Sequence, residues 1–138
     1  MRYLIPLLFL IIIISGCTQA EQTFFAPEQL TEQKDFLLEQ KITVEGLAKI
    51  ESPICTSIAC PEEDPCCNTC GGNLALKGEK EKILILGEYQ EKEISCKGDS
   101  CNISCYPLEK EKKYQVTGIW KKAGSEYYLE LEDFRLIE

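Results

Sequence analysis

The alternation of apolar and polar residues along the chain predicts a protein built mainly from β-strands. In residues 41–51 the even positions are apolar or glycine, while charged residues hold most of the odd positions. Gly46 lies inside this segment, and a glycine within a strand indicates a bend or a bulge. The same pattern, followed along the chain, predicts five strands, over residues 41–51, 73–77, 82–87, 113–121 and 126–137.

Two of these strands carry a further signal. Residues 83–86 are apolar without alternation, which predicts a central strand covered on both faces. In the last strand the apolar positions change parity between Leu131 and Phe134, and one extra residue near Glu132 and Asp133 would produce that change. We therefore expect a β-bulge at this point of the last strand.

The segments between the strands are less regular. Pro27 and Glu28 suit the start of a short helix, because proline is tolerated in a first helical turn. Four apolar residues of this region are expected to pack against the domain: Leu30, Phe36, Leu37 and Leu38. Residues 54–73 and 88–112 are long connections without periodicity, and the second has room for a short helix.

The first residues of the chain follow a different pattern. Arg2 is the only charged residue before an apolar run over residues 4–14, and Ser15 and Gly16 follow that run. A charged start, an apolar centre and small residues before a cleavage point are the parts of a secretory signal. The run is shorter than the roughly 20 residues that a membrane-spanning helix needs. These residues therefore predict export without a permanent transmembrane helix.

Ile14-Ser15-Gly16-Cys17 resembles the lipobox of prokaryotic lipoproteins, in which an aliphatic residue and two small residues precede a cysteine. The resemblance implies that the Cys17 thiol receives a diacylglyceryl lipid and that the chain is cut before this cysteine. The alternative is an ordinary signal peptide, with Cys17 as an unpaired thiol.

The lipobox resemblance also implies a division of the chain. Residues 1–16 are then a signal peptide, residues 17–26 a lipidated tether, and residues 27–138 the folded domain, which leaves a mature chain of about 122 residues, the length of one domain. The implied location is the extracytoplasmic face of the cell membrane or of an outer membrane.

Cysteine is the most informative residue type in the rest of the chain. Besides Cys17 there are eight cysteines in two groups: Cys55, Cys60, Cys66, Cys67 and Cys70, and then Cys96, Cys101 and Cys105. In an exported protein this density predicts a disulfide framework. Because each group holds an odd number, complete oxidation requires at least one disulfide between the groups. The adjacent residues Cys66 and Cys67 are expected to bond to different partners, and the remaining pairing stays open.

Two other uses of these cysteines stay open as alternatives. Cys67-x-x-Cys70 has the spacing of a thiol–disulfide exchange motif, although Gly71 directly after it would break the helix that such a motif needs. The second alternative is a tetrathiolate zinc site, but zinc ribbons use two pairs of this spacing and the chain contains one. A solvated acidic turn, rather than a cation site, is expected for three residues of the first group: Glu62, Glu63 and Asp64.

The composition excludes several classes of chemistry. The chain contains no histidine, which removes serine–histidine and cysteine–histidine catalysis and the commonest mixed zinc ligand. The formal net charge is −8, and an acidic surface repels nucleic acid. We therefore expect no catalytic residue, no metal and no cofactor other than the lipid on Cys17. Asn102-Ile103-Ser104 matches a glycosylation sequon, which matters only in a host with that machinery.

The order of the predicted strands resembles the OB-fold, a five-stranded barrel. The resemblance rests on residues 42–46, 114–120 and 127–131, with the last two strands joined as a hairpin. It implies a mainly β fold with a variable element after the third strand, and many OB-folds bind oligonucleotides or oligosaccharides on the second and third strands. A different small barrel or a sandwich is the alternative.

Aromatic residues concentrate on the last two predicted strands. Trp120, Tyr127 and Tyr128 are expected mainly to pack in the core or across the hairpin, and any that are exposed would form a binding platform. The sequence as a whole predicts a non-catalytic, lipid-anchored binding domain whose partner is an envelope protein or a glycan. Its expected contact surfaces are the two disulfide-rich loops and the exposed face of the last hairpin.

Overall fold

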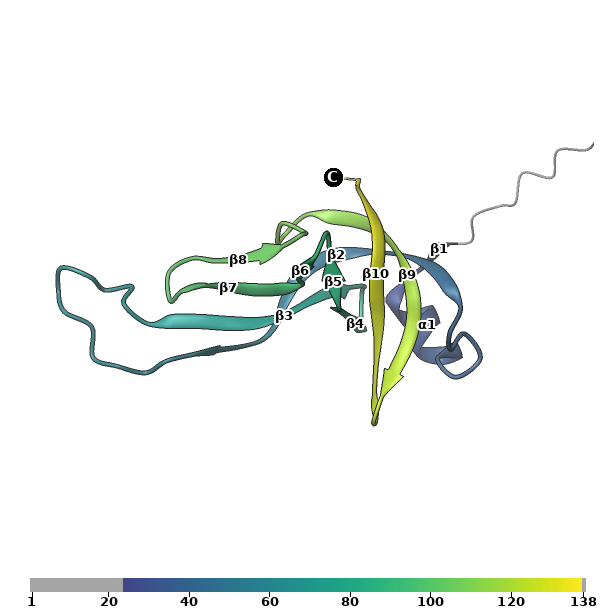
Figure 1. Cartoon of the computed structure of the whole chain (residues 1–138), viewed down its shortest axis with the longest axis horizontal. Coiled ribbons are helices and arrows are strands. Elements are labelled where there is room, and N and C mark those ends of the chain that lie inside the picture. The colour runs from purple at the N-terminus through teal and green to yellow at the C-terminus, as the bar shows by residue number, and fades with distance from the viewer. Residues whose placement is uncertain (1–23, 138) are drawn as a thin grey trace, which may run out of the picture.

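The computed structural model describes residues 24–137 of the 138-residue chain (Figure 1). The signal-like segment, the lipobox and most of the expected tether lie outside these residues. The described part contains one helix, α1 (Pro27–Gln33), which is too short to cross a membrane. The strands are β1 (Phe24–Phe25), β2 (Lys41–Cys55), β3 (Thr69–Lys77), β4 (Lys82–Leu86), β5 (Glu88–Tyr89), β6 (Lys92–Glu93), β7 (Ser95–Asp99), β8 (Ile103–Tyr106), β9 (Lys113–Ala123) and β10 (Glu126–Leu136).

Five of these strands pair in a closed circuit, so the fold is mainly β, as the alternation predicts. β2 pairs antiparallel with β3, and β3 pairs antiparallel with β4. β4 then pairs in parallel with β10, β10 pairs antiparallel with β9, and β9 returns antiparallel to β2. These five strands correspond to the five that the sequence predicts.

β2 changes its pairing partner next to a glycine. Its first half pairs with β9 and its second half with β3, and the change occurs at Leu47. At Gly46 the backbone passes so close to β3 that an added Cβ would lie 3.1 Å from the Leu76 Cβ. The register shift in β2 falls between Glu51 and Ile54 instead of at the glycine.

The circuit and the helix enclose one apolar core. Trp120 on β9 is the largest fully buried side chain, and its indole Nε1–H donates a hydrogen bond to the Lys34 carbonyl oxygen at 2.9 Å. α1 begins at a proline, and the Gln29 side chain accepts a hydrogen bond from the Ala26 N–H at 2.8 Å. Leu30 on this helix is completely buried in the core, and burying a leucine contributes roughly 1.5–3 kcal/mol.

The residues that follow the start of α1 agree only in part with the prediction. Leu30 and Leu37 are buried and Leu38 is partly buried, but Phe36 is 78% exposed. The prediction that Phe36 packs against the domain is therefore wrong. It fails because α1 ends at Gln33, and the turns that follow leave Phe36 on the outside.

The burial of β4 also differs from the prediction. Its two isoleucines are buried, whereas Leu84 and Leu86 are half-buried, so the burial alternates along the strand. β4 is central, between β3 and β10, yet only one of its faces is fully covered. The bulge predicted for the last strand is confirmed, since the register of β10 shifts between Leu131 and Asp133.

The long connections contain more regular structure than the sequence predicts. β2 extends to Cys55 and β3 begins at Thr69, so only residues 56–68 form the loop between them. The second connection holds β5, β6, β7 and β8, and the helix considered there is absent from it. Phe24–Phe25, expected to lie in the tether, pairs in parallel with β2.

Candidate functional site

An arm built from two β-hairpins projects from the five-stranded body. We define the arm as residues 51–73 and 95–106, which include the far ends of β2 and β3 and all of β7 and β8. β3 pairs with β7, and β7 pairs with β8, so the two hairpins form one continuous sheet. In Figure 1 the arm extends to the left, away from α1 and from the β9–β10 hairpin. Most of its residues are exposed and lie beyond the apolar core.

The eight cysteines of the arm form four disulfides: Cys55–Cys70, Cys60–Cys67, Cys66–Cys101 and Cys96–Cys105. The first and the last of these link residues directly opposite each other on neighbouring strands. The disulfide between Cys66 and Cys101 joins the two hairpins across a sequence separation of 35 residues. The predicted link between the two cysteine groups is confirmed, and Cys66 and Cys67 do bond to different partners.

This pairing differs from what the two alternative uses of the cysteines require. A thiol–disulfide exchange motif needs Cys67 and Cys70 in one shared disulfide, but Cys67 is bonded to Cys60 and Cys70 to Cys55. A tetrathiolate zinc site needs free thiolates, and every cysteine in residues 24–137 is in a disulfide. The geometry of the arm therefore supports neither a redox motif nor a zinc site.

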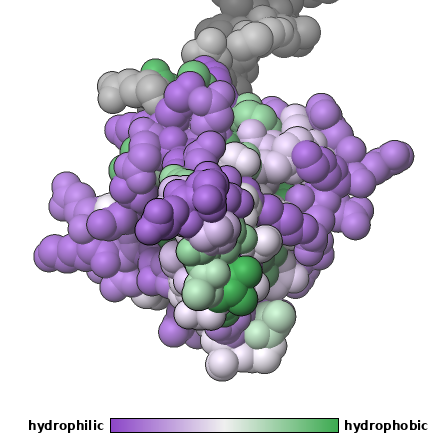
Figure 2. All heavy atoms as spheres, turned by 90° about the vertical axis from the view of Figure 1, so that its left-hand side faces the viewer, coloured by the Kyte–Doolittle hydropathy of each residue, from purple (hydrophilic) through white to green (hydrophobic). Residues whose placement is uncertain are grey.

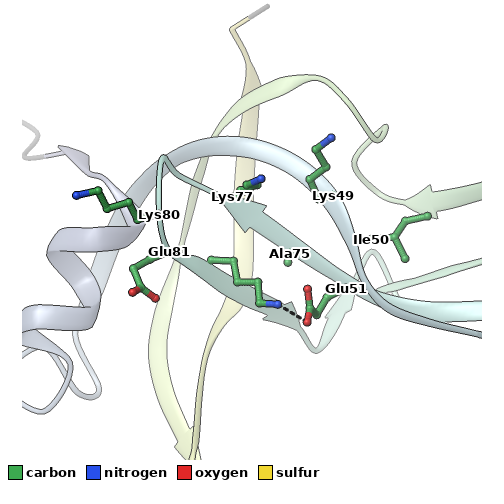
Figure 3. Close-up of a pocket in the computed structure, with 8 residues that line it drawn as sticks. Lys49, Ile50, Glu51, Ala75, Lys77, Lys80 and Glu81 are labelled. Carbon is green, nitrogen blue, oxygen red and sulfur yellow. Dashed lines mark hydrogen bonds and ion pairs between the residues drawn. The ribbon is translucent and has the colours of Figure 1, made fainter.

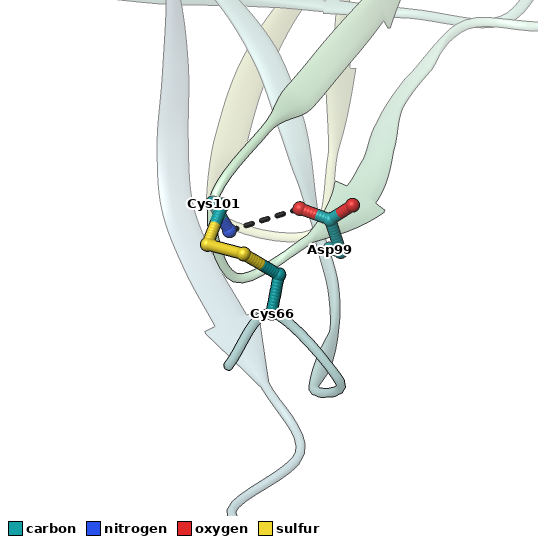
Figure 4. Close-up of side chains that lie close together, drawn as sticks. All are labelled: Cys66, Asp99 and Cys101. Carbon is teal, nitrogen blue, oxygen red and sulfur yellow. Dashed lines mark hydrogen bonds between the residues drawn. A yellow bond between two sulfur atoms is a disulfide. The ribbon is translucent and has the colours of Figure 1, made fainter. Parts of the chain in front are cut away.

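A carboxylate closes the turn between β7 and β8. The Asp99 oxygen and the sulfurs of Cys66 and Cys101 lie within 4.8 Å of one another, but the two sulfurs are bonded to each other (Figure 4). The Asp99 Oδ1 accepts hydrogen bonds from the N–H groups of Cys101 at 2.9 Å and Asn102 at 2.7 Å. Asp99 thus stabilises the turn that carries Cys101.

One asparagine organises the end of the arm. The Asn68 Oδ1 accepts hydrogen bonds from the Ile58 N–H at 2.9 Å and from the Thr56 hydroxyl at 3.1 Å. The Asn68 Nδ2 donates to the Ile58 carbonyl oxygen at 3.2 Å. The main-chain carbonyl oxygen of Asn68 accepts a hydrogen bond from the Ser100 N–H of the other hairpin, at 2.8 Å. These bonds fix the position of Ile58 and connect the loop to the β7–β8 turn.

The arm carries both exposed apolar residues and acidic residues. Ile54 is 78% exposed and Ile58 is 61% exposed. The view of the molecule from the arm side shows a small group of hydrophobic residues within a largely hydrophilic surface (Figure 2). Residues 52–70 contain no lysine or arginine, but they contain three acidic residues, Glu62, Glu63 and Asp64. Ile54 lies on β2, where this strand pairs with β3, and Ile58 lies in the loop that follows, so both side chains are exposed on the arm.

The aromatic residues of the last hairpin are used mainly inside the protein. Trp120 is only 2% exposed and stacks on Tyr127 with 5.9 Å between the ring centroids, so Trp120 is not available to a ligand. The Tyr127 hydroxyl forms a hydrogen bond with Asp35, and the Lys122 ammonium lies 4.8 Å from the centre of the tyrosine ring. Hydrogen bonding to this hydroxyl raises the pKa of Lys122. Tyr127 and Tyr128 are half-buried, so this hairpin offers no open aromatic platform.

The sequence prediction identified the cysteines of the arm but missed Ile54, Ile58 and Asn68. Ile54 directly precedes the first cysteine of the arm and Ile58 lies between Cys55 and Cys60, and no periodicity marks either of them as exposed. Asn68 lies between Cys67 and Cys70, and a small polar residue in such a loop is the one signal that could have suggested a turn-forming side chain.

Together these features define a small, mainly β, disulfide-rich domain with a projecting arm. No family model matches the chain, and the searches of curated proteins and of solved structures find no match. The function is therefore argued from the geometry of the protein itself.

Proposed function

We propose that the protein is a non-catalytic binding domain, held at the extracytoplasmic face of a prokaryotic membrane by a diacylglyceryl lipid on Cys17. Its main contact surface is the end of the arm. The four disulfides support this location, because disulfides form and persist in oxidising compartments. The residues that resemble a lipobox support the anchor.

We further propose that the five-stranded circuit is an OB-fold-like barrel. The strand order supports this assignment: β2, β3 and β4 are neighbours in sequence, and β10 lies between β4 and β9 before the circuit returns to β2. The variable element that follows the third strand of such a barrel is here the segment containing β5 to β8.

The observation that carries the proposed function is the crosslinked arm with two exposed isoleucines, Ile54 on β2 and Ile58 in the loop that follows it. Binding through a flexible loop is costly because the loop must become ordered, and disulfides impose much of that order before a partner arrives. Ile54 and Ile58 would enter an apolar recess of the partner, and the three neighbouring carboxylates favour a basic rim around it. An envelope protein with such a recess fits this surface better than a glycan does.

Photo-crosslinking in the native host tests this proposal. A photoreactive amino acid at position 54 or 58 should give an adduct with one envelope protein. The same amino acid at position 36 is the matched control, because Phe36 is as exposed as Ile54 but lies on the body. Adducts of equal yield from all three positions, or no adduct from positions 54 and 58, would contradict the arm as the contact surface.

A further inference from the structure

A groove on the body of the protein carries a concentration of lysine side chains. It has a volume of about 480 Å³ and lies over β2, β3 and the turn between β3 and β4. Figure 3 shows Lys49, Lys77 and Lys80 along one rim and Glu51 and Glu81 along the other, with the backbone of β3 between them. The volume falls in the range of roughly 300–1,000 Å³ that is typical of small-molecule sites.

Two lysines of this groove have no acidic partner. Lys49 is paired with Glu111, and Lys82 at the floor of the groove is paired with Glu51. Lys77 and Lys80 form no ion pair with any residue between positions 24 and 137. Lys77 and Lys80 are thus two unpaired ammonium groups beside one groove, at a turn that also carries the Glu81 carboxylate and binds that of Glu28.

The opposite rim sets a second requirement on the ligand. The pKa of Glu51 is lowered, mainly by the hydrogen bond from Lys82, so this carboxylate is ionised at neutral pH. Carboxylates accept hydrogen bonds from hydroxyl groups and repel negative charge. A ligand that is anionic along its whole length therefore suits only the lysine rim, whereas a ligand with acid groups and hydroxyls suits both rims. The residues that line the groove include no aromatic ring on which a nucleobase could stack.

Helix α1 holds the turn that carries part of the groove. The Glu28 Oε1 accepts hydrogen bonds from the N–H groups of Lys80 at 2.7 Å and Glu81 at 3.1 Å. Gly78 makes room for this carboxylate, because an added Cβ would lie 2.4 Å from the same oxygen. The backbone of Lys80 and Glu81, whose side chains lie on opposite rims, is therefore held in place by one side chain.

We propose that the groove binds an acidic saccharide, with a sugar carboxylate at Lys77 and Lys80 and sugar hydroxyls at Glu81. Apart from Glu51 at the base of the arm, the site lies on the body, and the proposal does not depend on the function proposed for the arm.

Calorimetric titration of the mature protein with trigalacturonic acid, maltotriose and inorganic polyphosphate tests this proposal. Trigalacturonic acid should bind, and its affinity should fall as salt rises, while the neutral maltotriose should bind at least about tenfold more weakly. Replacing both free lysines, Lys77→Gln with Lys80→Gln, should reduce the affinity for trigalacturonic acid by about tenfold or more. Lys110→Gln is the control for the single variants Lys77→Gln and Lys80→Gln, because it removes the same one charge from an exposed lysine that does not line the groove.

The carboxylate rim provides a second test, in which the affinities for trigalacturonic acid and for polyphosphate should change in opposite directions. Glu81→Met removes both the hydroxyl acceptor and the negative charge, so it should weaken the binding of trigalacturonic acid and should strengthen the binding of polyphosphate. Three results would each overturn the proposal: no binding of trigalacturonic acid at millimolar concentration, an equal loss in the Lys110→Gln control, or tighter binding of polyphosphate than of trigalacturonic acid.

Discussion

Two polar side chains, Asn68 in the arm and Glu28 on α1, fix loops by bonding to backbone groups. In each case one residue holds another segment in the position where it meets solvent. Asn68 holds the loop that exposes Ile58, and Glu28 holds the turn that exposes Lys80. Both candidate surfaces therefore depend on residues that would not themselves touch a ligand.

The Glu28 contact gives the protein a measurable pH dependence. The N–H groups of Lys80 and then of Glu81 lower the pKa of Glu28 from its ordinary value of 4.5. A carboxylate whose pKa is lowered by folding adds stability above the unfolded pKa, and this stability is lost as the pH falls through the folded pKa. Urea midpoints should therefore differ most between the wild type and Glu28→Gln at neutral pH, and the difference should narrow below about pH 4.5.

The matched control for this measurement is Glu32→Gln. Glu32 lies on the same helix, but its side chain makes no hydrogen bond or ion pair within the described residues, so it tests the effect of a charge change alone. A difference between the wild type and Glu28→Gln that stays constant from neutral to acidic pH would show that the backbone contacts of Glu28 do not stabilise the ionised form.

At the scale of elements, the arm depends on its disulfides more than on burial. The Cys66–Cys101 disulfide spans 35 residues, and the chain-entropy relation assigns such a crosslink about 3.5–4 kcal/mol. The Cys60–Cys67 disulfide spans 7 residues, for which the same relation gives about 2–2.5 kcal/mol. Replacing both cysteines of the longer crosslink by serine should therefore lower the free energy of unfolding more than the same change in the shorter one.

Urea unfolding of the two double-serine variants measures this difference, and each variant serves as the control for the other. The longer crosslink also joins the two hairpins, so its removal should increase amide hydrogen exchange in both of them. Equal losses of stability, or a larger loss for the shorter crosslink, would indicate that strain or residual structure in the unfolded chain outweighs loop entropy.

Sequence reasoning succeeded where strands bury one face. β9 and β10 alternate because their inner residues enter the core, so their positions and the bulge after Leu131 could be read directly. It failed for the strands of the arm, because neither face of β7 or β8 is covered enough to impose an alternation. Those strands are held by crosslinks and by pairing with β3, which leave little trace in the order of apolar and polar residues.

The candidate sites show the same limit. An odd number of cysteines in each group predicted a crosslink between the groups, but only the fold shows that it joins Cys66 to Cys101. The groove that we propose as a saccharide site combines Lys49 on β2 with residues of the turn after β3, which is distant in sequence. Because that proximity arises from strand pairing, no local pattern in the sequence could have revealed it.

At the scale of the whole molecule, the proposed anchor is tested by the intact mass of the protein extracted from membranes. The mass should correspond to a chain that begins at Cys17 and carries a lipid. Before reduction no cysteine should react with an alkylating reagent, and after reduction eight should react. Cys17→Ser should remove the lipid and release the protein from the membrane.

Three outcomes would contradict this anchored and fully oxidised form. An alkylated Cys17 would indicate an ordinary signal peptide, and a mass without lipid would exclude the anchor. Alkylation of the arm cysteines before reduction would show free thiols in place of disulfides. That result would favour a thiol–disulfide exchange motif or a thiolate metal site.

The position of the disulfides determines when the arm can reach its final structure. α1, β4, β9 and β10 contain no cysteine, so most of the body can assemble under reducing conditions. All four crosslinks lie in the arm, which cannot be completed until the chain reaches an oxidising compartment. A copy retained in the cytoplasm would present a folded body with an unfinished arm. If the protein is exported as we propose, its arrival in an oxidising compartment would be the step that completes the proposed contact surface.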